Sequence, residues 1–171
     1  MKRMSTWDVV PVIATLLLSM SSPTIAGTKV GDKAPDFSAT TLDGRKVALS
    51  NYMGKKPLYL VFWATWCPNC QKEIPEINTL HEKFGNRLAI LAINVGINDS
   101  ANAARKYGKE HGMQYAIIFD KGSAITTAYG IVGTPTQILV GADGIIRYRS
   151  SRTPAAADIK AHWDILVGKK K

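Results

Sequence analysis

A buried strand that leads directly into a cysteine-bearing helix is the feature that most restricts the fold of this chain. Residues 58–63 read LYLVFW, a continuous run of apolar, strand-forming residues that is typical of the centre of a sheet. The string W-C-P-N-C follows at 66–70, and apolar residues then recur every three or four positions, which predicts a helix over 66–84. The pattern therefore predicts an α/β domain in which a central strand delivers two cysteines to a helix N-terminus.

In the rest of the chain, predicted strands also alternate with predicted helices. Strands are predicted over 36–42, 46–49, 88–95, 115–119, 136–140 and 145–149, and helices over 100–111, 123–129 and 155–166. Pro75 is expected to kink the helix 66–84, because it lacks an N–H and crowds the preceding turn. This order predicts one domain over 27–171, with a mixed central sheet, helices on both faces and an extra N-terminal β-hairpin.

The first 26 residues have the layout of a signal peptide. A basic start is followed by an apolar stretch over 9–20 and by small residues just before Gly27, where cleavage is expected. The alternative is an uncleaved anchor, but the apolar stretch is short for a membrane span of about 20 residues, and polar residues follow it. We expect a periplasmic or otherwise extracytoplasmic protein that is soluble after cleavage or anchored by its N-terminus.

The chain is basic, with a formal net charge of +9. A basic surface can attract nucleic acid, anionic membranes or acidic proteins. Apart from the run Lys169–Lys171 the basic residues are scattered, and an exported protein rarely meets nucleic acid. We therefore expect no nucleic-acid partner, and we expect a monomer.

The two cysteines have a position and a spacing suited to redox chemistry. Cys67 is expected at the helix N-terminus, where unpaired N–H groups and the helix dipole lower the pKa of a thiol and favour the reactive thiolate. Pro68 suits the first helical turn, whose N–H groups are unpaired in any case. Cys70 is close enough to attack a mixed disulfide at Cys67, and we expect it to be the more buried cysteine. Cys67 is thus predicted to attack the partner and Cys70 to resolve the mixed disulfide.

The cysteine pair allows two other interpretations, a structural disulfide and a zinc site. A structural disulfide between residues three apart closes only a tiny loop and removes little entropy from the unfolded chain. A zinc site needs further ligands, and His81, His111 and His162 are single and far apart in the sequence. We therefore expect no metal and no prosthetic group, with the dithiol of Cys67 and Cys70 as the redox group.

Several spaced motifs resemble those of thioredoxins in their order. They are the W-C-x-x-C string between strand and helix, Pro75 five residues after Cys70, and Thr134-Pro135 further on. The segment G-D-K-A-P-D-F, and F-W-A-T-W-C-P-N-C followed by K-E-I-P, resemble the TlpA/ResA branch of exported, membrane-facing reductases. The resemblance covers about 31–167 and implies a thioredoxin fold.

The resemblance implies a client-binding surface around the cysteines. Pro135 corresponds to a cis-proline beside the active site, and Thr134 to the preceding residue, which lines the redox face and tunes it. The backbone at this point pairs with bound partners in the manner of an added strand. Trp66 is expected to cover the disulfide and to offer partners an apolar surface, next to Pro68.

The resemblance also implies a proton acceptor. Glu73 corresponds to an acidic residue on the same helix face as Cys70, and our hypothesis is that it assists deprotonation of that thiol. Thioredoxin has a buried aspartate for this purpose at the position of Val61. The alternative is a solvated surface glutamate. The chain departs from the family at Gln137, where an apolar or aromatic strand residue is usual.

The function that the resemblance implies is thiol–disulfide exchange. Reduction of exported clients is expected, such as apocytochrome c or copper-site cysteines, with electrons from a membrane thiol-reductant donor of the CcdA/DsbD type. An oxidase or isomerase with the same residues stays open, because a sequence does not reveal a reduction potential. A peroxiredoxin shares the opening segment, but the motif P-x-x-x-[ST]-x-x-C is absent at Cys67 and Cys70. A copper chaperone would need C-x-x-x-C and a partner histidine, and the chain has neither.

Overall fold

A computed structural model describes residues 27–168, and its centre is a five-stranded mixed sheet. The strands are β3 (Leu58–Trp63), β4 (Ala89–Asn94), β5 (Ala116–Phe119), β6 (Thr136–Val140) and β7 (Ile146–Ser150). Their order is β5-β4-β3-β6-β7, with β3, β4 and β5 parallel and with β6 antiparallel to both β3 and β7. β3 is buried along its whole length, as its apolar sequence predicts. The signal peptide predicted over 1–26 lies outside the described residues.

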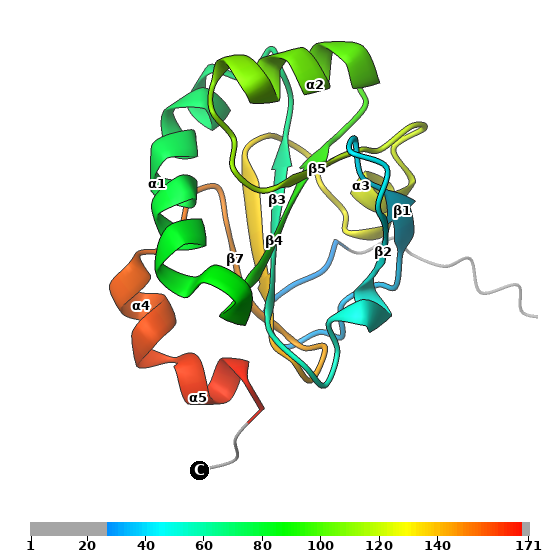
Figure 1. Ribbon diagram of the computed structural model, residues 1–171. Coiled ribbons are helices and arrows are strands. Elements are labelled where there is room, and N and C mark those ends of the chain that lie inside the picture. The colour runs from blue at the N-terminus through cyan, green and yellow to red at the C-terminus, as the bar shows by residue number, and fades with distance from the viewer. Residues whose placement is uncertain (1–26, 169–171) are drawn as a thin grey trace, which may run out of the picture.

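Helices cover both faces of this sheet, which confirms the predicted layers (Figure 1). They are α1 (Pro68–Phe84), α2 (Ala101–Glu110), α3 (Ala124–Ala128), α4 (Ala156–Ala161) and α5 (Trp163–Leu166), with short 3-10 helices over Leu49–Asn51 and Gly85–Arg87. With the sheet seen nearly edge-on, α1, α4 and α5 lie on one side and α3 on the other, while α2 lies across one end beside the start of α1. Within residues 27–168, none of these helices is long and apolar enough to cross a membrane.

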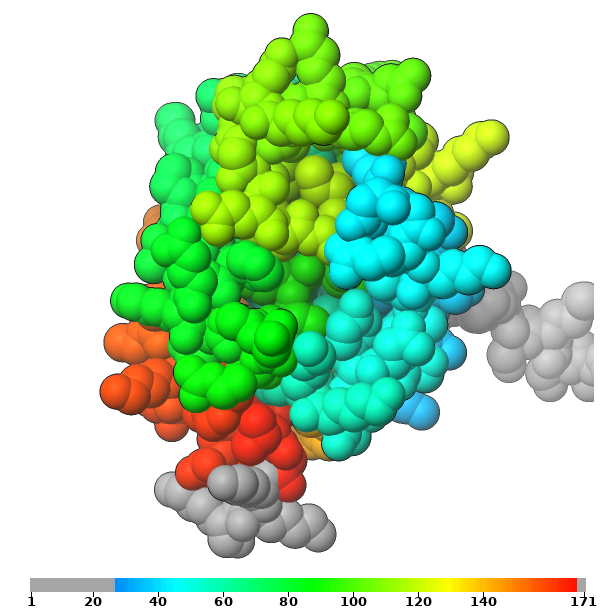
Figure 2. Space-filling model, in the orientation of Figure 1, coloured from blue at the N-terminus to red at the C-terminus, as the bar shows by residue number. Residues whose placement is uncertain are grey.

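The predicted N-terminal hairpin is a small sheet of its own. It consists of β1 (Ser38–Thr40) paired antiparallel with β2 (Lys46–Ala48). A bridge between Thr41 and Ile118, and a hydrogen bond from the Leu42 N–H to the Ile117 carbonyl, join it to β5. Figure 2 shows the hairpin, in cyan, packed against the yellow-green segment that contains β5. The hairpin therefore covers part of an edge strand whose backbone would otherwise be open.

Two predicted elements differ from the structure. The strand predicted over 36–42 is shorter and covers Ser38–Thr40; at its C-terminal end the hydroxyl of Thr41 accepts the backbone N–H of Arg45 and closes the turn. The helix predicted over 155–166 is broken into α4 and α5 at His162, whose φ of −101° and ψ of 13° are not helical. The ring Nδ1 of His162 lies 2.9 Å from the carbonyl oxygen of Asp158, which stabilises the break.

Candidate active site

The helix that carries the cysteines begins at Pro68, two residues after the predicted start at Trp66, and Cys67 lies at its N-terminus as expected. Cys67 is the N-cap residue of α1, with extended backbone angles, and its Sγ accepts the backbone N–H of Cys70 at 3.2 Å. Pro68 takes the first helical position, where its missing N–H removes no intrahelical bond. α1 then continues through Pro75 for 17 residues in all. The positive end of its dipole therefore lies at the Sγ of Cys67.

The two cysteines are joined as a disulfide, so the structure represents the oxidised state. Cys67 is 4% exposed and Cys70 is 6% exposed, so the expectation that Cys70 is the more buried one is wrong. The reason is that the bonded sulfurs are in contact and each one shields the other from solvent. The unequal roles stay a prediction that rests on position, because Cys67 caps the helix and Cys70 lies inside its first turn.

The loop before β6 faces the start of α1. The Thr134–Pro135 peptide bond is cis, as the resemblance implies. Pro135 is buried, and with Cys70 and Glu73 it lines a small enclosed cavity behind the disulfide. Thr134 is half-buried and lines a larger groove on the outer side of the same loop. The fold thus brings together residues that are more than sixty positions apart in the sequence.

The surface beside Cys67 is apolar and exposed. Trp66 is 51% exposed, and its Nε1 donates a hydrogen bond to the carbonyl of Ile97 at 2.8 Å, which fixes the orientation of the ring. Pro68, on the other side of Cys67 in the chain, is also exposed. Such apolar groups next to a reactive disulfide offer a contact surface to a protein partner.

Glu73 turns its carboxylate into the protein. One oxygen, Oε2, accepts the side-chain amide N–H of Gln137 at 2.5 Å, and Oε1 accepts the backbone N–H of Thr153 at 3.2 Å. Burial raises the pKa of Glu73, and the hydrogen bonds from Gln137 and Thr153 partly oppose that rise. Glu73 is therefore a half-buried, hydrogen-bonded carboxyl group rather than a solvated one. A raised pKa suits it to exchange protons closer to neutral pH.

Gln137 is the residue through which β6 reaches Glu73. It is fully buried, and its Oε1 accepts the hydroxyl of the equally buried Tyr59 at 2.8 Å. In the sheet Gln137 pairs with Val61 of β3, the position at which thioredoxin has an aspartate. The departure from the family at this position thus has a structural role, which sequence reasoning missed. The sequence does contain a signal for this role, since Gln137 is an amide inside an otherwise apolar strand. A buried amide needs polar partners, so a nearby polar side chain could have been expected.

Sequence reasoning also missed Asn94 and Asp99, which hold the turn before Cys67. The Oδ2 atom of Asp99 accepts the backbone N–H of Thr65 at 2.8 Å and the amide N–H of Asn94 at 2.7 Å. Burial acts to raise the pKa of Asp99, but these hydrogen bonds outweigh it and the pKa is lowered. The charged carboxylate therefore anchors the turn that delivers Cys67 to the helix.

Comparison with known proteins places this fold and its cysteine pair in one class, the thioredoxin-fold thiol–disulfide oxidoreductases. The chain belongs to the AhpC/TSA family, whose model matches residues 30–149. It is 32% identical over 175 residues to the thiol-disulfide oxidoreductase ResA of Geobacillus thermodenitrificans, which covers 97% of this chain and 99% of that protein. It is 34% identical over 122 residues to the thioredoxin-like protein YneN of Bacillus subtilis, which covers 71% of each.

A solved structure supports the same class. A protein assigned as the thiol:disulfide interchange protein DsbE of Chlorobium tepidum superposes with a TM-score of 0.68 at 27% identity, over 83% of this chain and 99% of that chain. The predicted thioredoxin fold and the predicted thiol–disulfide oxidoreductase activity are therefore confirmed. The roles assigned to individual site residues stay predictions.

The contact between Gln137 and Glu73 can be tested by titration. In Gln137→Met the carboxylate loses a donor that favours its charged form, so we expect the pKa of Glu73 to rise above that of the wild type. The measurement is a carboxyl-carbon NMR titration of Glu73 in the oxidised protein. Gln114→Met, at an exposed glutamine elsewhere, is the matched control and should leave this pKa unchanged. An unchanged or lowered pKa in Gln137→Met contradicts the assignment.

Proposed function

We propose that this thiol–disulfide oxidoreductase works outside the cytoplasm and reduces disulfides of exported client proteins. The observation that carries the proposal is the half-buried carboxyl group of Glu73 beside Cys70, in the cavity behind the disulfide. A proton acceptor at this place is needed when Cys70 acts as a nucleophile, which is the second step of client reduction. The names of the curated relatives agree with the general reaction.

In the first step the thiolate of Cys67 attacks one sulfur of the client disulfide. The client S–S bond breaks, a mixed disulfide forms at Cys67, and the released client thiolate takes a proton from solvent. The helix dipole at the N-cap stabilises the attacking thiolate, since it places partial positive charge at the sulfur. Exposed Trp66 and the loop at Thr134 provide the surface against which the client lies.

In the second step Cys70 releases the client. Its thiol gives a proton to the carboxylate of Glu73, and the resulting thiolate attacks the Sγ of Cys67. The mixed disulfide breaks, the Cys67–Cys70 disulfide forms, and the second client sulfur leaves and is protonated. Two electrons have then passed from the protein to the client; the two client sulfurs take up protons from solvent, and Glu73 returns the proton of Cys70 to solvent. Gln137 and Thr153 keep the carboxylate oriented through the cycle, so they are positioning residues.

The setting of this chemistry follows from the N-terminal segment and the family resemblance. The layout of residues 1–26 supports export, with either a soluble product or an N-terminal anchor. The spent disulfide must be reduced again for each cycle, and a membrane thiol-reductant donor of the CcdA/DsbD type would supply the electrons. Apocytochrome c and proteins with copper-site cysteines are the client classes that we propose.

The roles of the two cysteines are tested by trapping. In Cys70→Ser the second step is blocked, so we expect a stable mixed disulfide between Cys67 and a disulfide-bonded client peptide. In Cys67→Ser no such adduct should form, because the remaining thiol lies inside the helix turn. The measurement is intact mass on non-reducing samples. An adduct in Cys67→Ser and none in Cys70→Ser would reverse the assignment.

The proton transfer to Glu73 predicts a pH-dependent rate. The carboxylate is the base, so the rate of the second step should rise with pH through the raised pKa of Glu73. Glu73→Gln should be slower below about pH 8.5 and approach the wild type above it, where a thiol ionises unaided. Single-turnover release of a fluorescent client thiol measures this rate. Glu76→Gln removes the same charge from an exposed position on α1 and is the control, and superimposable profiles for Glu73→Gln and the wild type would refute the hypothesis.

The direction of electron flow is tested by the reduction potential. A reductant should have a Cys67–Cys70 potential near or below about −230 mV, while a potential above about −150 mV would indicate an oxidase or isomerase. Equilibration of the purified protein with dithiol buffers of known poise measures it. A potential above about −150 mV would leave the site residues and the reaction class unchanged, but the protein would then be an oxidase or isomerase and not a reductant.

A further inference from the structure

A groove of about 610 Å³ opens beside the cysteine pair. We call it the CxxC groove and define it by Asn69, Lys72 and Glu73 of α1, by residues 132–136, and by Ser151 and Arg152 after β7. Asn69 stands between the two cysteines in the chain, and Pro135 reaches both this groove and the cavity behind Cys70. A client segment that approaches the disulfide along the cis-proline therefore lies in the CxxC groove.

Two cations line the CxxC groove and form no ion pair among the described residues. They are Lys72 and Arg152, and both are exposed. The one acidic residue among the lining residues is Glu73, whose oxygens are bound by Gln137 and Thr153 instead. The two cations come from different segments of the chain, α1 and the residues after β7.

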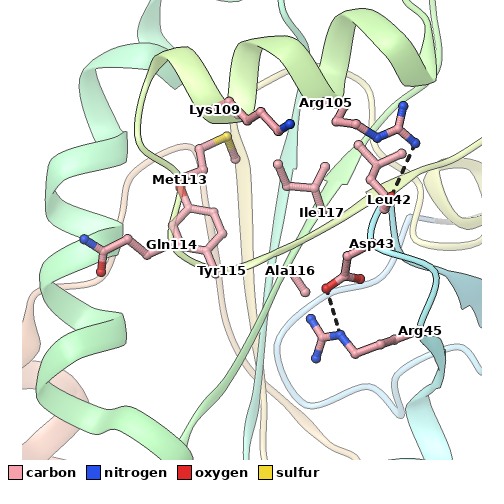
Figure 3. Close-up of a pocket in the computed structure, with 11 residues that line it drawn as sticks. Leu42, Asp43, Arg45, Arg105, Lys109, Met113, Gln114, Tyr115, Ala116 and Ile117 are labelled. Carbon is pink, nitrogen blue, oxygen red and sulfur yellow. Dashed lines mark hydrogen bonds and ion pairs between the residues drawn. The ribbon is translucent and has the colours of Figure 1, made fainter.

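In a second basic groove, most of the basic side chains already have partners within the protein. It has a volume of about 460 Å³. Figure 3 shows it beside β5, with Arg45, Arg105 and Lys109 among its lining residues. Arg45 is paired with Asp43, and Arg105 donates a hydrogen bond to the carbonyl of Leu42, as the dashed lines in Figure 3 show. Two of its three cations are thus already bound within the protein, while both cations of the CxxC groove are available.

The rim of the CxxC groove is apolar at one point. Val132 lines the groove and is fully exposed. Trp66 does not line the groove, but it directly precedes Cys67 and is half-exposed, so a client at the disulfide meets it as well. Apolar groups of this size on a surface are typical of contact sites for protein partners. The complementary ligand is a polypeptide that carries carboxylates for the two cations and an apolar side chain for the rim.

We propose that the CxxC groove selects client segments with acidic side chains close to the disulfide, and that Lys72 and Arg152 are the specificity-determining residues that bind those carboxylates. The inference rests on the proposed function, because it concerns which disulfides the cysteine pair attacks. Charge complementarity speeds the association of the client with the protein. It should therefore raise the second-order rate constant of disulfide exchange and leave the reduction potential of the cysteine pair unchanged. Proteins with acidic segments around a cysteine pair are then better clients than those with basic segments.

The test uses three synthetic peptides, each closed by one internal disulfide and identical except for two flanking residues. These residues are glutamates, asparagines or lysines. The reduced full-length protein is mixed with each peptide, and kcat/KM is divided by the rate of the same peptide with dithiothreitol, which removes differences in intrinsic reactivity. At about 0.1 M salt we expect the glutamate peptide to exceed the lysine peptide about three- to tenfold, and the ratio to approach one at about 1 M salt, where the Debye length falls to ~3 Å.

Charge reversal tests whether Lys72 and Arg152 cause the preference for the glutamate peptide. In the double variant K72E/R152E the preference should invert in favour of the lysine peptide. The matched control K109E/K160E makes the same change in net charge at exposed lysines of α2 and α4, and it should retain the preference of the wild type. Equal changes in both double variants would assign the preference to the overall charge of the protein and overturn the inference.

The asparagine peptide separates this inference from the function on which it rests. If the wild type does not reduce the asparagine peptide, the proposed reduction of client disulfides fails. If the wild type reduces all three peptides at equal normalised rates, the function stands and the charge selection is overturned. A glutamate preference that K72E/R152E leaves intact also overturns it, because other groups then recognise the client.

Discussion

The buried strand β3 fixes where the redox chemistry of this protein takes place. It pairs with β4 on one side and β6 on the other, and all six of its side chains are buried. A slip by one residue would exchange every side chain between the two faces, so the register of such a strand is strongly fixed. The turn after β3 is anchored by Asp99, and α1 must therefore begin at Cys67. The placement of a reactive sulfur at the positive end of a helix follows from the packing of the core.

Strand β6 supplies the other half of the site. Pro135 and Gln137 are two residues apart, and both lie next to Glu73. Side chains two apart in an extended segment share one face, so β6 and the residue before it present both the cis-proline and the amide that holds the carboxyl group. The hydroxyl of Tyr59 completes the hydrogen bonding of that amide from β3. A buried polar cluster is stable only when its members are satisfied in this way.

The sequence predicts the parts of the site that depend on local order, and it misses the parts that depend on register between distant strands. The position of Cys67 and the strand before it follow from local patterns, and the cis bond at Pro135 follows from the family motif. The contact of Gln137 with Glu73 joins residues 64 apart, and no local pattern shows which strand faces α1. The similar burial of the two cysteines depends on their oxidation state, which a sequence does not encode. Apolar spacing over 155–166 fits a continuous helix and a broken one equally well, so the break at His162 was missed.

The orientation of Glu73 links the chemistry to the charge of the groove. A carboxylate that pointed outward from the first turns of α1 would offset the cations at Lys72 and Arg152 and would repel an acidic client. Its hydrogen bonds to Gln137 and Thr153 hold it instead between the groove and the cavity that Cys70 lines. If Glu73 takes the proton of Cys70 as proposed, its negative charge is removed while the client is still bound through the mixed disulfide. The attraction between groove and acidic client is then greatest before the second bond exchange and declines when Glu73 gives that proton up, so the loss of the proton from Glu73 favours release of the product.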